Sequence, residues 1–505
     1  MTDTAAPPPA SPSPDDPVPG AWVETPAERA KLERDLLYLP DNPPPSLDRL
    51  AASPLLRRIN TLRTIRRASR NLLDMVHPDL ADRRWHAVKV GPELVITVND
   101  PDFARHVLQG NAGNYVKGRF YEIVFAKFLG ASSLTLDGAA WRQRRRLISP
   151  AFNARAIRGV EEVVTRHAEA MLDGWRAAAR GAGPGGAVVD LGADVSGLAM
   201  RVAMEAFFSS DMGDETARIG RLMDVVITDA GSPPFADVMG LGRWAPRRSR
   251  KAGMAALAEL DAWLLPRIDA RLARREGGEP EAPDLLDILV HARDEETGAL
   301  LDRQAIRNEV LTLFSAGHET TALSLVWGLD RLSREPAWQD RLAQAAAAAA
   351  QAAGGPLDPA AARGVAELPA AYDEILRLYP PAFSIGRQAV EDDRFEDLEI
   401  PAGTRVQVVI GLIHRNRRFW ETPGVFDPGR FLGEAKAGRH PFAHIPFGAG
   451  PRICVGLALA RLEGLMTLAR ALPDLRLLPD GPPPEPLGKI TLRTKGPARM
   501  RVALR

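Results

Sequence analysis

The only cysteine of this 505-residue chain is Cys454, in the stretch 447–456 that reads FGAGPRICVG. One cysteine excludes an internal disulfide, and it excludes iron–sulfur and zinc sites that need several cysteines from one chain. The stretch joins a Gly/Pro-rich turn to an apolar segment, 455–471, whose spacing predicts a helix. The amide groups and the dipole at the start of that helix favour a negative charge on the thiol. The pattern predicts a thiolate metal ligand, with a buried core cysteine as the alternative.

The residues around the cysteine suit a flat, anionic ligand. Gly450 and Gly456 carry no side chain, so a macrocycle can approach the backbone closely. Phe447 can pack beside the sulfur, and Arg452 has a fixed positive charge suited to a carboxylate. A core cysteine does not account for these residue types at this spacing.

Composition narrows the class of protein. Apolar residues make up 45% and charged residues 26%, which is typical of a globular chain, and the formal net charge is +1. We therefore expect neither nucleic acid nor a membrane surface as a partner. Residues 1–20 are rich in Pro, Ser, Asp and Ala and predict a disordered tail without the features of a signal peptide. No uncharged apolar run reaches membrane-spanning length, so we expect a cytoplasmic protein without a membrane anchor.

Apolar periodicity predicts a mainly α fold with small β-sheets. Helical spacing covers the segments 46–76, 160–180, 197–223, 251–275, 303–334 and 370–379, and the alanine-rich stretch 343–355 predicts a surface helix. Alternation predicts a hairpin over 86–100, a strand over 404–414 and a second hairpin over 489–505. No clear linker divides residues 21–505, which predicts one domain.

The cysteine stretch resembles the haem-binding loop of the cytochromes P450, F-x-x-G-x-R-x-C-x-G. The matching residues are Phe447, Gly450, Arg452, Cys454 and Gly456. The resemblance implies the cytochrome P450 fold, with haem b (iron protoporphyrin IX) between an oxygen-binding helix and the cysteine loop. It implies that Cys454 is the axial thiolate on iron, which favours O–O cleavage.

A second stretch, AGHETT at 316–321, is similar to the oxygen-binding motif of the family. By that resemblance Ala316 and Gly317 leave room for dioxygen beside the helix. Thr320 can bond back to the carbonyl of Ala316 and order water, and Glu319 is the adjacent acid that resupplies protons.

Two further stretches resemble the structural charge motifs of the family. In YDEILRLYPP, Glu374 and Arg377 lie at i and i+3 on one helix face. FDPGRF supplies Arg430 as the third member of a buried triad, with Gly429 where the family shows an acidic residue. The same E-x-x-R spacing recurs at Glu215 and at Glu391, so the spacing alone identifies nothing. We expect the triad to hold the cysteine loop.

Basic residues complete the resemblance. Trp141 and Arg145 lie at i and i+4 and match the W-x-x-x-R pattern that reaches a haem propionate. Arg387 matches a second propionate-binding arginine of the family. The remaining arginines of WRQRRR, namely Arg142, Arg144 and Arg146, are a candidate docking surface for an acidic electron donor.

The resemblance implies a monooxygenase that inserts one atom of dioxygen into a C–H bond of an apolar fatty acid, terpenoid or steroid. Electrons must come from a separate ferredoxin or flavodoxin with its reductase, because the chain has no flavin, nicotinamide or iron–sulfur motif. The candidate residues of the substrate pocket are apolar: Phe120, Val124, Phe125, Phe383 and Ile385. A peroxide-driven peroxygenase and a non-catalytic haem sensor are the alternatives.

Overall fold

The computed structural model describes most of the chain beyond position 70. The described residues are Ser53, 71–90, 93–183, 185–209, 213–230, 250–278 and 284–505. The predicted tail, 1–20, lies outside them, as does the predicted helix over 46–76 except for its last turn. The expectation of a single domain over 21–505 stays a prediction.

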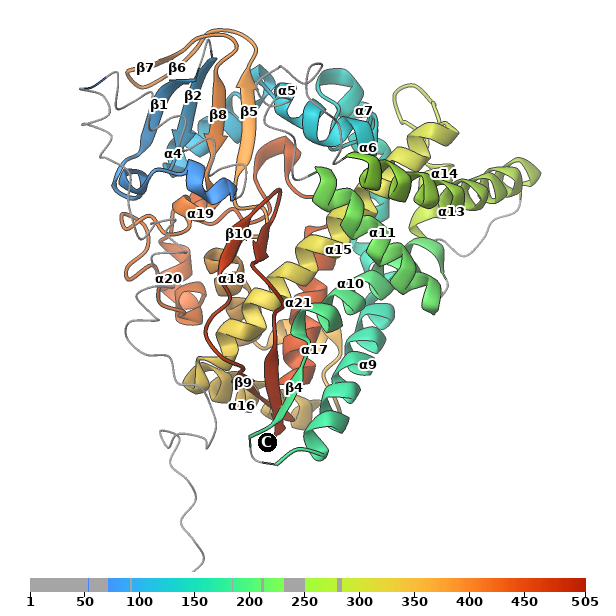
Figure 1. Cartoon of the computed structure of the whole chain (residues 1–505), viewed down its shortest axis with the longest axis vertical. Coiled ribbons are helices and arrows are strands. Elements are labelled where there is room, and N and C mark those ends of the chain that lie inside the picture. Colours follow the sequence, from blue (N-terminus) through green and yellow to red (C-terminus); the bar gives the residue numbers. More distant parts are fainter. Residues whose placement is uncertain are drawn as a thin grey trace, which may run out of the picture.

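Helices dominate the described chain (Figure 1). The longer ones are α7 (Gly138–Ile148), α9 (Glu161–Arg180), α10 (Leu191–Phe208), α11 (Asp214–Ala230), α13 (Arg250–Gly277), α15 (Arg303–Ser333), α16 (Pro336–Ala353), α18 (Glu367–Leu378) and α21 (Leu457–Ala471). Short helices and single turns are η1 (Leu72–Met75), η2 (Pro78–Asp82), α4 (Pro101–Arg105), η3 (His106–Gly110), η4 (Ala112–Asn114), α5 (Gly118–Tyr121), η5 (Glu122–Ala126), α6 (Lys127–Leu129), η6 (Ser149–Phe152), α8 (Ala154–Gly159), α14 (Leu285–His291), α17 (Pro359–Gly364), α19 (Ile410–Ile413), η7 (Pro428–Phe431), α20 (Gly433–Ala437), η8 (Pro441–Ala443) and η9 (Gly450–Arg452).

The strands form small sheets. The largest has the order β1-β2-β8-β5-β3, built from β1 (Trp85–Val90), β2 (Glu93–Val98), β8 (Arg405–Val408), β5 (Ile385–Ala389) and β3 (Tyr115–Val116). In a three-stranded sheet, β12 (Met500–Leu504) lies between β4 (Ala187–Val189) and β9 (Leu475–Pro479) and pairs with both. The remaining two sheets are the pairs β6 (Asp393–Phe395) with β7 (Leu398–Ile400) and β10 (Pro486–Gly488) with β11 (Leu492–Thr494). The predicted class, mainly α with small sheets, is confirmed.

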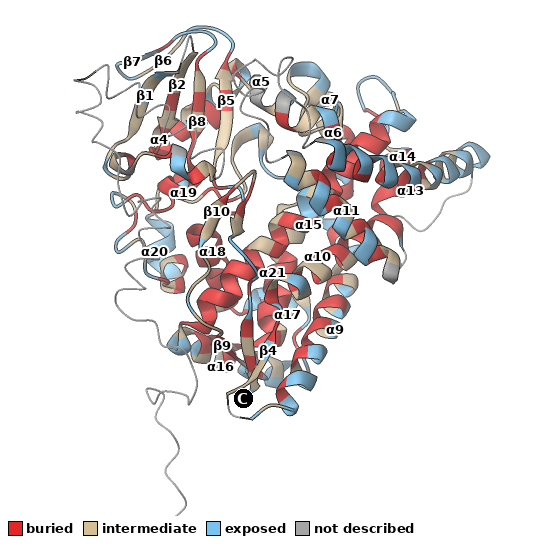
Figure 2. Ribbon diagram, viewed as in Figure 1, coloured by how far each residue is buried: buried red, intermediate tan, exposed pale blue. Residues whose placement is uncertain are grey.

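The long helix α15 crosses the middle of the fold (Figure 1) and packs against α10, α13, α18, α21 and β9. Asp302 caps its start by accepting a hydrogen bond from the amide of Ala305 at 2.7 Å. Helices on several sides leave it little solvent, so most of its residues are buried (Figure 2). Charged residues are rarely buried without a partner, so the buried Arg307, Glu309 and Glu319 of this helix are informative.

The predicted hairpin over 86–100 is confirmed, because β1 and β2 pair antiparallel from Trp85 opposite Val98 to Val90 opposite Glu93. The predicted hairpin over 489–505 is wrong. Its two halves form separate strands: β11 pairs with β10, whereas β12 pairs with β4 and β9. Strand pairing is non-local, so alternation within one segment cannot identify the partner.

Two other boundaries also differ from the sequence prediction. The segment 197–223 is two helices rather than one, because α10 ends at Ser209 in a left-handed conformation (φ 54°) and α11 begins at Asp214. The predicted strand over 404–414 is β8 followed by the helical turn α19. All four residues of α19 are buried, so its apolar pattern is the same as that of a buried strand.

Candidate functional site

The cysteine loop is a tight turn that only glycine permits at two points. The amide of Cys454 donates to the carbonyl oxygen of Phe447 at 3.0 Å and closes the loop. Gly448 (φ 71°) and Gly450 (φ 68°) are both left-handed, and a Cβ on Gly450 would overlap the carbonyl oxygen of Leu108 in η3. The two glycines therefore permit the turn of the loop, and Gly450 allows the loop to pack directly against the backbone of η3.

The Cys454 thiol has accessible surface although dense protein surrounds it. Burial raises the pKa of this thiol, while a hydrogen bond from the backbone amide of Gly456 and the charge of Arg145 lower it. The amide of Gly456 lies just before α21, as expected for a thiolate at a helix start. A cation bound to the sulfur would complete the stabilisation of the charged form.

The middle of α15 is open on one side. Ala316 and Gly317 are exposed, while their neighbours along the helix are mostly buried. A Cβ on Gly317 would meet no atom within 4 Å. The hydroxyl of Thr320 donates to the carbonyl oxygen of Ala316 at 2.6 Å, as the resemblance implied. Open space therefore exists at the oxygen-binding motif.

The Glu319 carboxylate is tied to the strand β11. It accepts hydrogen bonds from Nε of Arg493 at 2.6 Å and from the Thr491 hydroxyl at 3.0 Å. Arg493 also donates to the hydroxyl of Thr228 in α11 at 3.1 Å. The neighbouring His318 bonds to the Ser196 hydroxyl of α10 at 2.8 Å. The acid of the motif is thus part of an ion pair between α15 and the β10–β11 hairpin.

Four cationic side chains gather near the cysteine loop: Lys117, Arg145, Arg387 and Arg452. Burial, followed by the neighbouring arginines Arg387 and Arg145, lowers the pKa of Arg452 to about 10 even though Asp137 raises it. Burial, Arg452 and Arg387 lower the pKa of Lys117 as well. Among described residues, no hydrogen bond or ion pair engages the guanidinium of Arg145. An anionic group placed here would relieve this repulsion.

Trp141 and Arg387, which the resemblance assigns to the haem propionates, both lie close to Arg452 of this cluster. The Arg452 guanidinium lies 4.1 Å from the centroid of the Trp141 ring. The Arg387 guanidinium donates to the carbonyl of Gly386 at 2.8 Å. It lies close enough to Arg452 for its charge to lower the pKa of Arg452. Lys117 was missed by the sequence analysis. Its one signal is a lysine directly after the apolar strand β3, and it is buried in the structure.

The charge triad is assembled, with Arg430 as its loosest member. Glu374 and Arg377 are both 0% exposed and form a two-pronged pair at 2.6 and 2.7 Å. The amide of Asp427 donates to Glu374 at 2.8 Å. Nε of Arg430 lies 3.7 Å from Glu374, and its NH2 group donates to Thr422. Gly429 leaves this arrangement intact.

His414, which the sequence analysis also missed, connects the triad to the cysteine loop. Its Nε2 accepts the amide of Ile445 at 2.8 Å, so Nδ1 carries the proton and donates to the carbonyl of Arg377 at 3.2 Å. Arg377 in turn donates to the carbonyls of His414, Pro423 and Val425. The triad therefore holds the chain segment before the loop rather than the loop itself.

Most of the predicted donor-docking arginines are occupied within the chain. Arg144 pairs with Glu309 at 3.2 Å, and Arg146 pairs with Asp294 at 2.9 Å. Of the three, only Arg142 is exposed and makes no ion pair with a described residue. Two of the three arginines are therefore neutralised within the chain, and this helix offers less positive charge to a partner than its sequence indicates.

The predicted pocket residues separate into two groups. Val124 and Phe383 are buried in the packed interior. Phe125 stacks on Tyr121, with ring centroids 5.5 Å apart, and keeps accessible surface. Ile385 also keeps accessible surface, and its Cδ1 lies 3.2 Å from where a Cβ on Gly448 would be. The side chain of Phe120 is not among those described.

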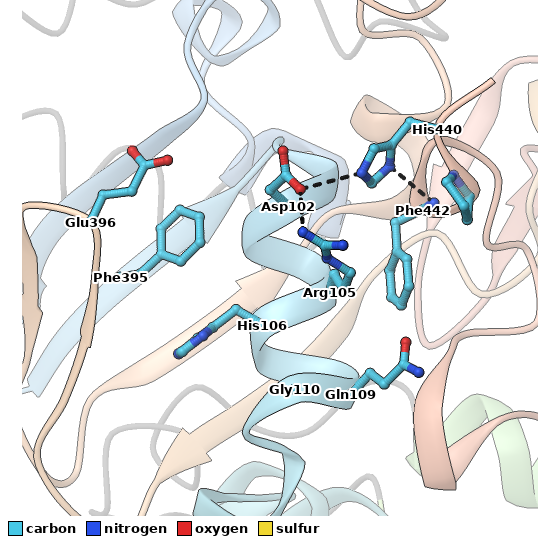
Figure 3. Close-up of a pocket in the computed structure, with 10 residues that line it drawn as sticks. Asp102, Arg105, His106, Gln109, Gly110, Phe395, Glu396, His440 and Phe442 are labelled. Atoms are coloured by element: carbon cyan, nitrogen blue, oxygen red, sulfur yellow. Dashed lines mark hydrogen bonds and ion pairs between the residues drawn. The ribbon is translucent and has the colours of Figure 1, made fainter. Parts of the chain in front are cut away.

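An open surface cleft of about 710 Å³ lies beside the cysteine loop, not in it. Its lining comes from α4, η3, the β6–β7 turn and η8 (Figure 3). Within the lining, Asp102 accepts from Arg105 at 2.9 Å and lies 3.3 Å from His440. The lining residues Glu396 and His106 bind partners outside it, Arg84 and Asp393 respectively. The cleft brings together none of the predicted site residues.

A soft thiolate ligand and a cluster of cations together suit a flat metal macrocycle with an anionic edge. Haem b has this chemistry, with iron for the sulfur and two propionates for the cations. The residues present therefore fit the class of haem-thiolate proteins.

Comparisons with known proteins agree with this class. A family model described as cytochrome P450 matches residues 84–501. Cyclooctatin synthase of Streptomyces melanosporofaciens is 30% identical over 432 residues, 84% of this chain and 88% of that protein. Leukotriene-B4 omega-hydroxylase 3 of Mus musculus is 30% identical over 82% of this chain and 81% of that protein. The cytochrome P450DA heme domain, at 22% identity, superposes with a TM-score of 0.72 over 83% of this chain and 90% of that structure.

The chain belongs to the cytochrome P450 family. It is a haem-thiolate monooxygenase, an oxidoreductase that binds haem b and uses dioxygen, an apolar substrate and a redox partner. Within the part of the chain that the structure describes, none of the helices combines the length and the apolar character needed to cross a membrane.

Proposed function

We propose that Cys454 is the thiolate ligand of the haem and that the enzyme hydroxylates an apolar small molecule of fatty-acid, terpenoid or steroid type. The observation that supports this most is the accessible thiol of the only cysteine, held at a helix start by the amide of Gly456. The bound haem supplies the activation of dioxygen and the oxidation of the C–H bond. The chain supplies the position of the substrate and the protons.

Thr320 is the proton-handling group at the open turn of α15. Its hydroxyl donates to the carbonyl of Ala316, so its oxygen can still accept a hydrogen bond, and open space exists beside the neighbouring Gly317. Once the Glu319 carboxylate leaves Arg493 it can take up a proton from solvent, and water ordered on the Thr320 oxygen can carry that proton into the open space. The exposed Ala316 and Gly317 leave room for dioxygen, as proposed from the sequence.

Arg145, Arg387, Arg452 and Lys117, with Trp141, hold the propionates. The pKa values of Arg145, Arg452 and Lys117 are lowered by burial, so two carboxylates in their midst would be bound by charge-assisted hydrogen bonds. Phe447 and Ile385 supply apolar contacts beside the cysteine loop.

The electron donor is an acidic ferredoxin or flavodoxin, reduced by its own reductase. Exposed arginines at the outer side of the cysteine loop support this: Arg142, Arg155 and Arg158. They belong to α7 and α8, on either side of η6, whose Phe152 lies 4.0 Å from where a Cβ on Gly456 would be. Ile453, which is 38% exposed, adds an apolar centre to this surface.

Turnover assays separate this proposal from its alternatives. With a reduced ferredoxin, dioxygen and a fatty acid or terpenoid panel, we expect oxygenated product and substrate-dependent consumption of reductant. Thr320→Ala should divert reductant to peroxide or water and lower the product formed per reductant. Product from hydrogen peroxide alone, equal in wild type and Thr320→Ala, would identify a peroxygenase. Absence of any oxygenated product with bound haem would identify a haem sensor.

A further inference from the structure

Asp137 stands at the start of α7 but does not cap the helix. Asp is a preferred capping residue because its carboxylate accepts an amide of the first turn. The side chain of Asp137 makes no such bond. Elsewhere in the described chain, six aspartates at the same position do cap their helices: Asp100, Asp190, Asp284, Asp302, Asp358 and Asp427. The carboxylate of Asp137 is used for something else.

Its two oxygens bridge two segments of the site that are far apart in sequence. Oδ2 accepts the backbone amide of Lys117 at 3.0 Å, and Oδ1 binds NH2 of Arg452. The same guanidinium donates from NH1 to the carbonyl of Leu136 at 2.9 Å and lies over the Trp141 ring. Asp137, Leu136 and Trp141 thus fix Arg452 on three sides.

The bridge has an electrostatic consequence. Lys117, Arg145, Arg387 and Arg452 are close enough to influence one another, and Asp137 is the carboxylate that contacts Arg452. A negative charge in a partly buried site opposes the addition of an electron nearby. Asp137 contacts Arg452, so its negative charge lies within the cationic cluster proposed to bind the propionates.

We propose that Asp137 is a positioning residue that holds Arg452 in place for a haem propionate and thereby sets the retention and the reduction potential of the haem. This rests on the proposed haem site at Cys454. Asp137 contacts neither the sulfur nor, in this proposal, the substrate, and it acts through Arg452.

The test compares Asp137→Asn with the matched variant Asp190→Asn. Asp190 caps α10 by accepting the amide of Ala193 at 2.9 Å, and asparagine is an equally good cap. In holoenzyme of Asp137→Asn we expect the ferric–ferrous midpoint potential to shift upward. We also expect haem transfer to excess apomyoglobin to become about tenfold faster, a loss of about 1.4 kcal/mol. Asp190→Asn should change neither quantity.

A second comparison measures whether Asp137 acts through Arg452. In an Arg452→Lys background the fork geometry is already lost, so adding Asp137→Asn should accelerate haem transfer much less than it does in wild type. Equal effects in both backgrounds would overturn the proposal, as would an unchanged potential and transfer rate in Asp137→Asn. Asp137→Asn could fold and yet take up no haem. The haem content of the double variant Asp137→Asn with Arg452→Lys should then equal that of Arg452→Lys alone. A further loss of haem in the double variant would overturn the proposal.

The outcome is distinguishable from failure of the haem site itself. If wild type lacks the strongly red-shifted Soret band of a reduced, carbonyl-bound thiolate haem, the proposed function fails, and with it the foundation of this proposal. If wild type shows the band and Asp137→Asn behaves as wild type, only the role of Asp137 is wrong.

Discussion

The buried charge of Arg377 is hydrogen-bonded to backbone carbonyls as well as to the carboxylate of Glu374. The Arg377 guanidinium is fully buried, and besides Glu374 it serves carbonyl oxygens at 414, 423 and 425. These carbonyls belong to the segment that leads to Ile445 and on to the cysteine loop. A buried charge of this kind defines the path of the chain, because leaving it uncompensated is far more costly than leaving a surface charge alone.

Loss of the Glu374 carboxylate tests this at the residue scale. Glu374→Ala leaves Arg377 buried without its partner, which should cost roughly 3–5 kcal/mol and give little haem-loaded protein. The matched control is Glu215→Ala, from the other E-x-x-R spacing, where a half-exposed pair with Arg267 at 3.2 Å should be worth about 1 kcal/mol or less. The measurements are the free energy of unfolding in urea and the ratio of haem to protein. A fully loaded, stable Glu374→Ala protein would contradict the account.

Among the elements, the β10–β11 hairpin and α15 are joined by an ion pair, Arg493 with Glu319, and by a hydrogen bond from Trp327 to the carbonyl of Leu492 at 2.9 Å. Arg493 of β11 joins Glu319 of α15 to Thr228 of α11. The oxygen-binding motif is thereby linked to a hairpin and a helix that belong to other parts of the chain. The carboxylate cannot be held by Arg493 and serve the open turn at the same time, so in the proposed function the pair acts as a latch on Glu319, the proposed proton source.

Variants of the two partners should differ in turnover. Glu319→Gln removes the acid and should slow product formation by about tenfold or more, with haem loading unchanged. Arg493→Gln removes only the latch and should keep most of the product formation. Steady-state rates and the product formed per reductant consumed provide the comparison. If both variants lose activity equally, the pair is structural and Glu319 is not the proton source.

Over the whole molecule, buried histidines make stability depend on pH. Burial lowers the pKa of His318 to about 4 and that of His414 to about 3, and it lowers the pKa of His444 strongly. Unfolded histidine has a pKa of about 6.5. Between pH 6.5 and about 4 the unfolded chain takes up protons that the folded chain does not, so stability falls as the pH falls.

The predicted slope is steep. Three such histidines reduce the free energy of unfolding by up to about 4 kcal/mol per pH unit between pH 6 and 4.5. His444→Gln keeps a donor for the carbonyl of Asp373, bonded at 3.1 Å in wild type, and should flatten the slope by about one proton. Urea unfolding of the holoenzyme at several pH values measures this, and a slope that His444→Gln leaves untouched would contradict the assignment.

The sequence indicated the parts of the site that lie within one segment. Phe447, Gly450, Arg452 and Cys454 lie in one loop, and Thr320 reaches Ala316 within one helical turn, so a local motif is enough to place these residues near one another. Long amphipathic helices such as α9 and α13 were predicted for the same reason.

Contacts between distant segments could not be predicted in this way. Arg493 meets Glu319 across 174 positions, and Arg452 meets Asp137 across 315. No local pattern marks such pairs. The same cause explains the wrong hairpin at the C-terminus, where β12 pairs with β4 and β9. The prediction that Arg144 and Arg146 of α7 are free for a partner was wrong for a related reason. The carboxylates that pair with them lie far along the chain.

The absorption spectrum of the reduced protein with carbon monoxide tests the central claim, that Cys454 binds the haem iron as a thiolate. Wild type should show a strongly red-shifted Soret band, and Cys454→Ser should bind haem without it. Well-folded, haem-loaded wild type with an unshifted band would mean that the sulfur is protonated or not bound to iron. A red-shifted band that persists in Cys454→Ser would contradict the assignment of the ligand.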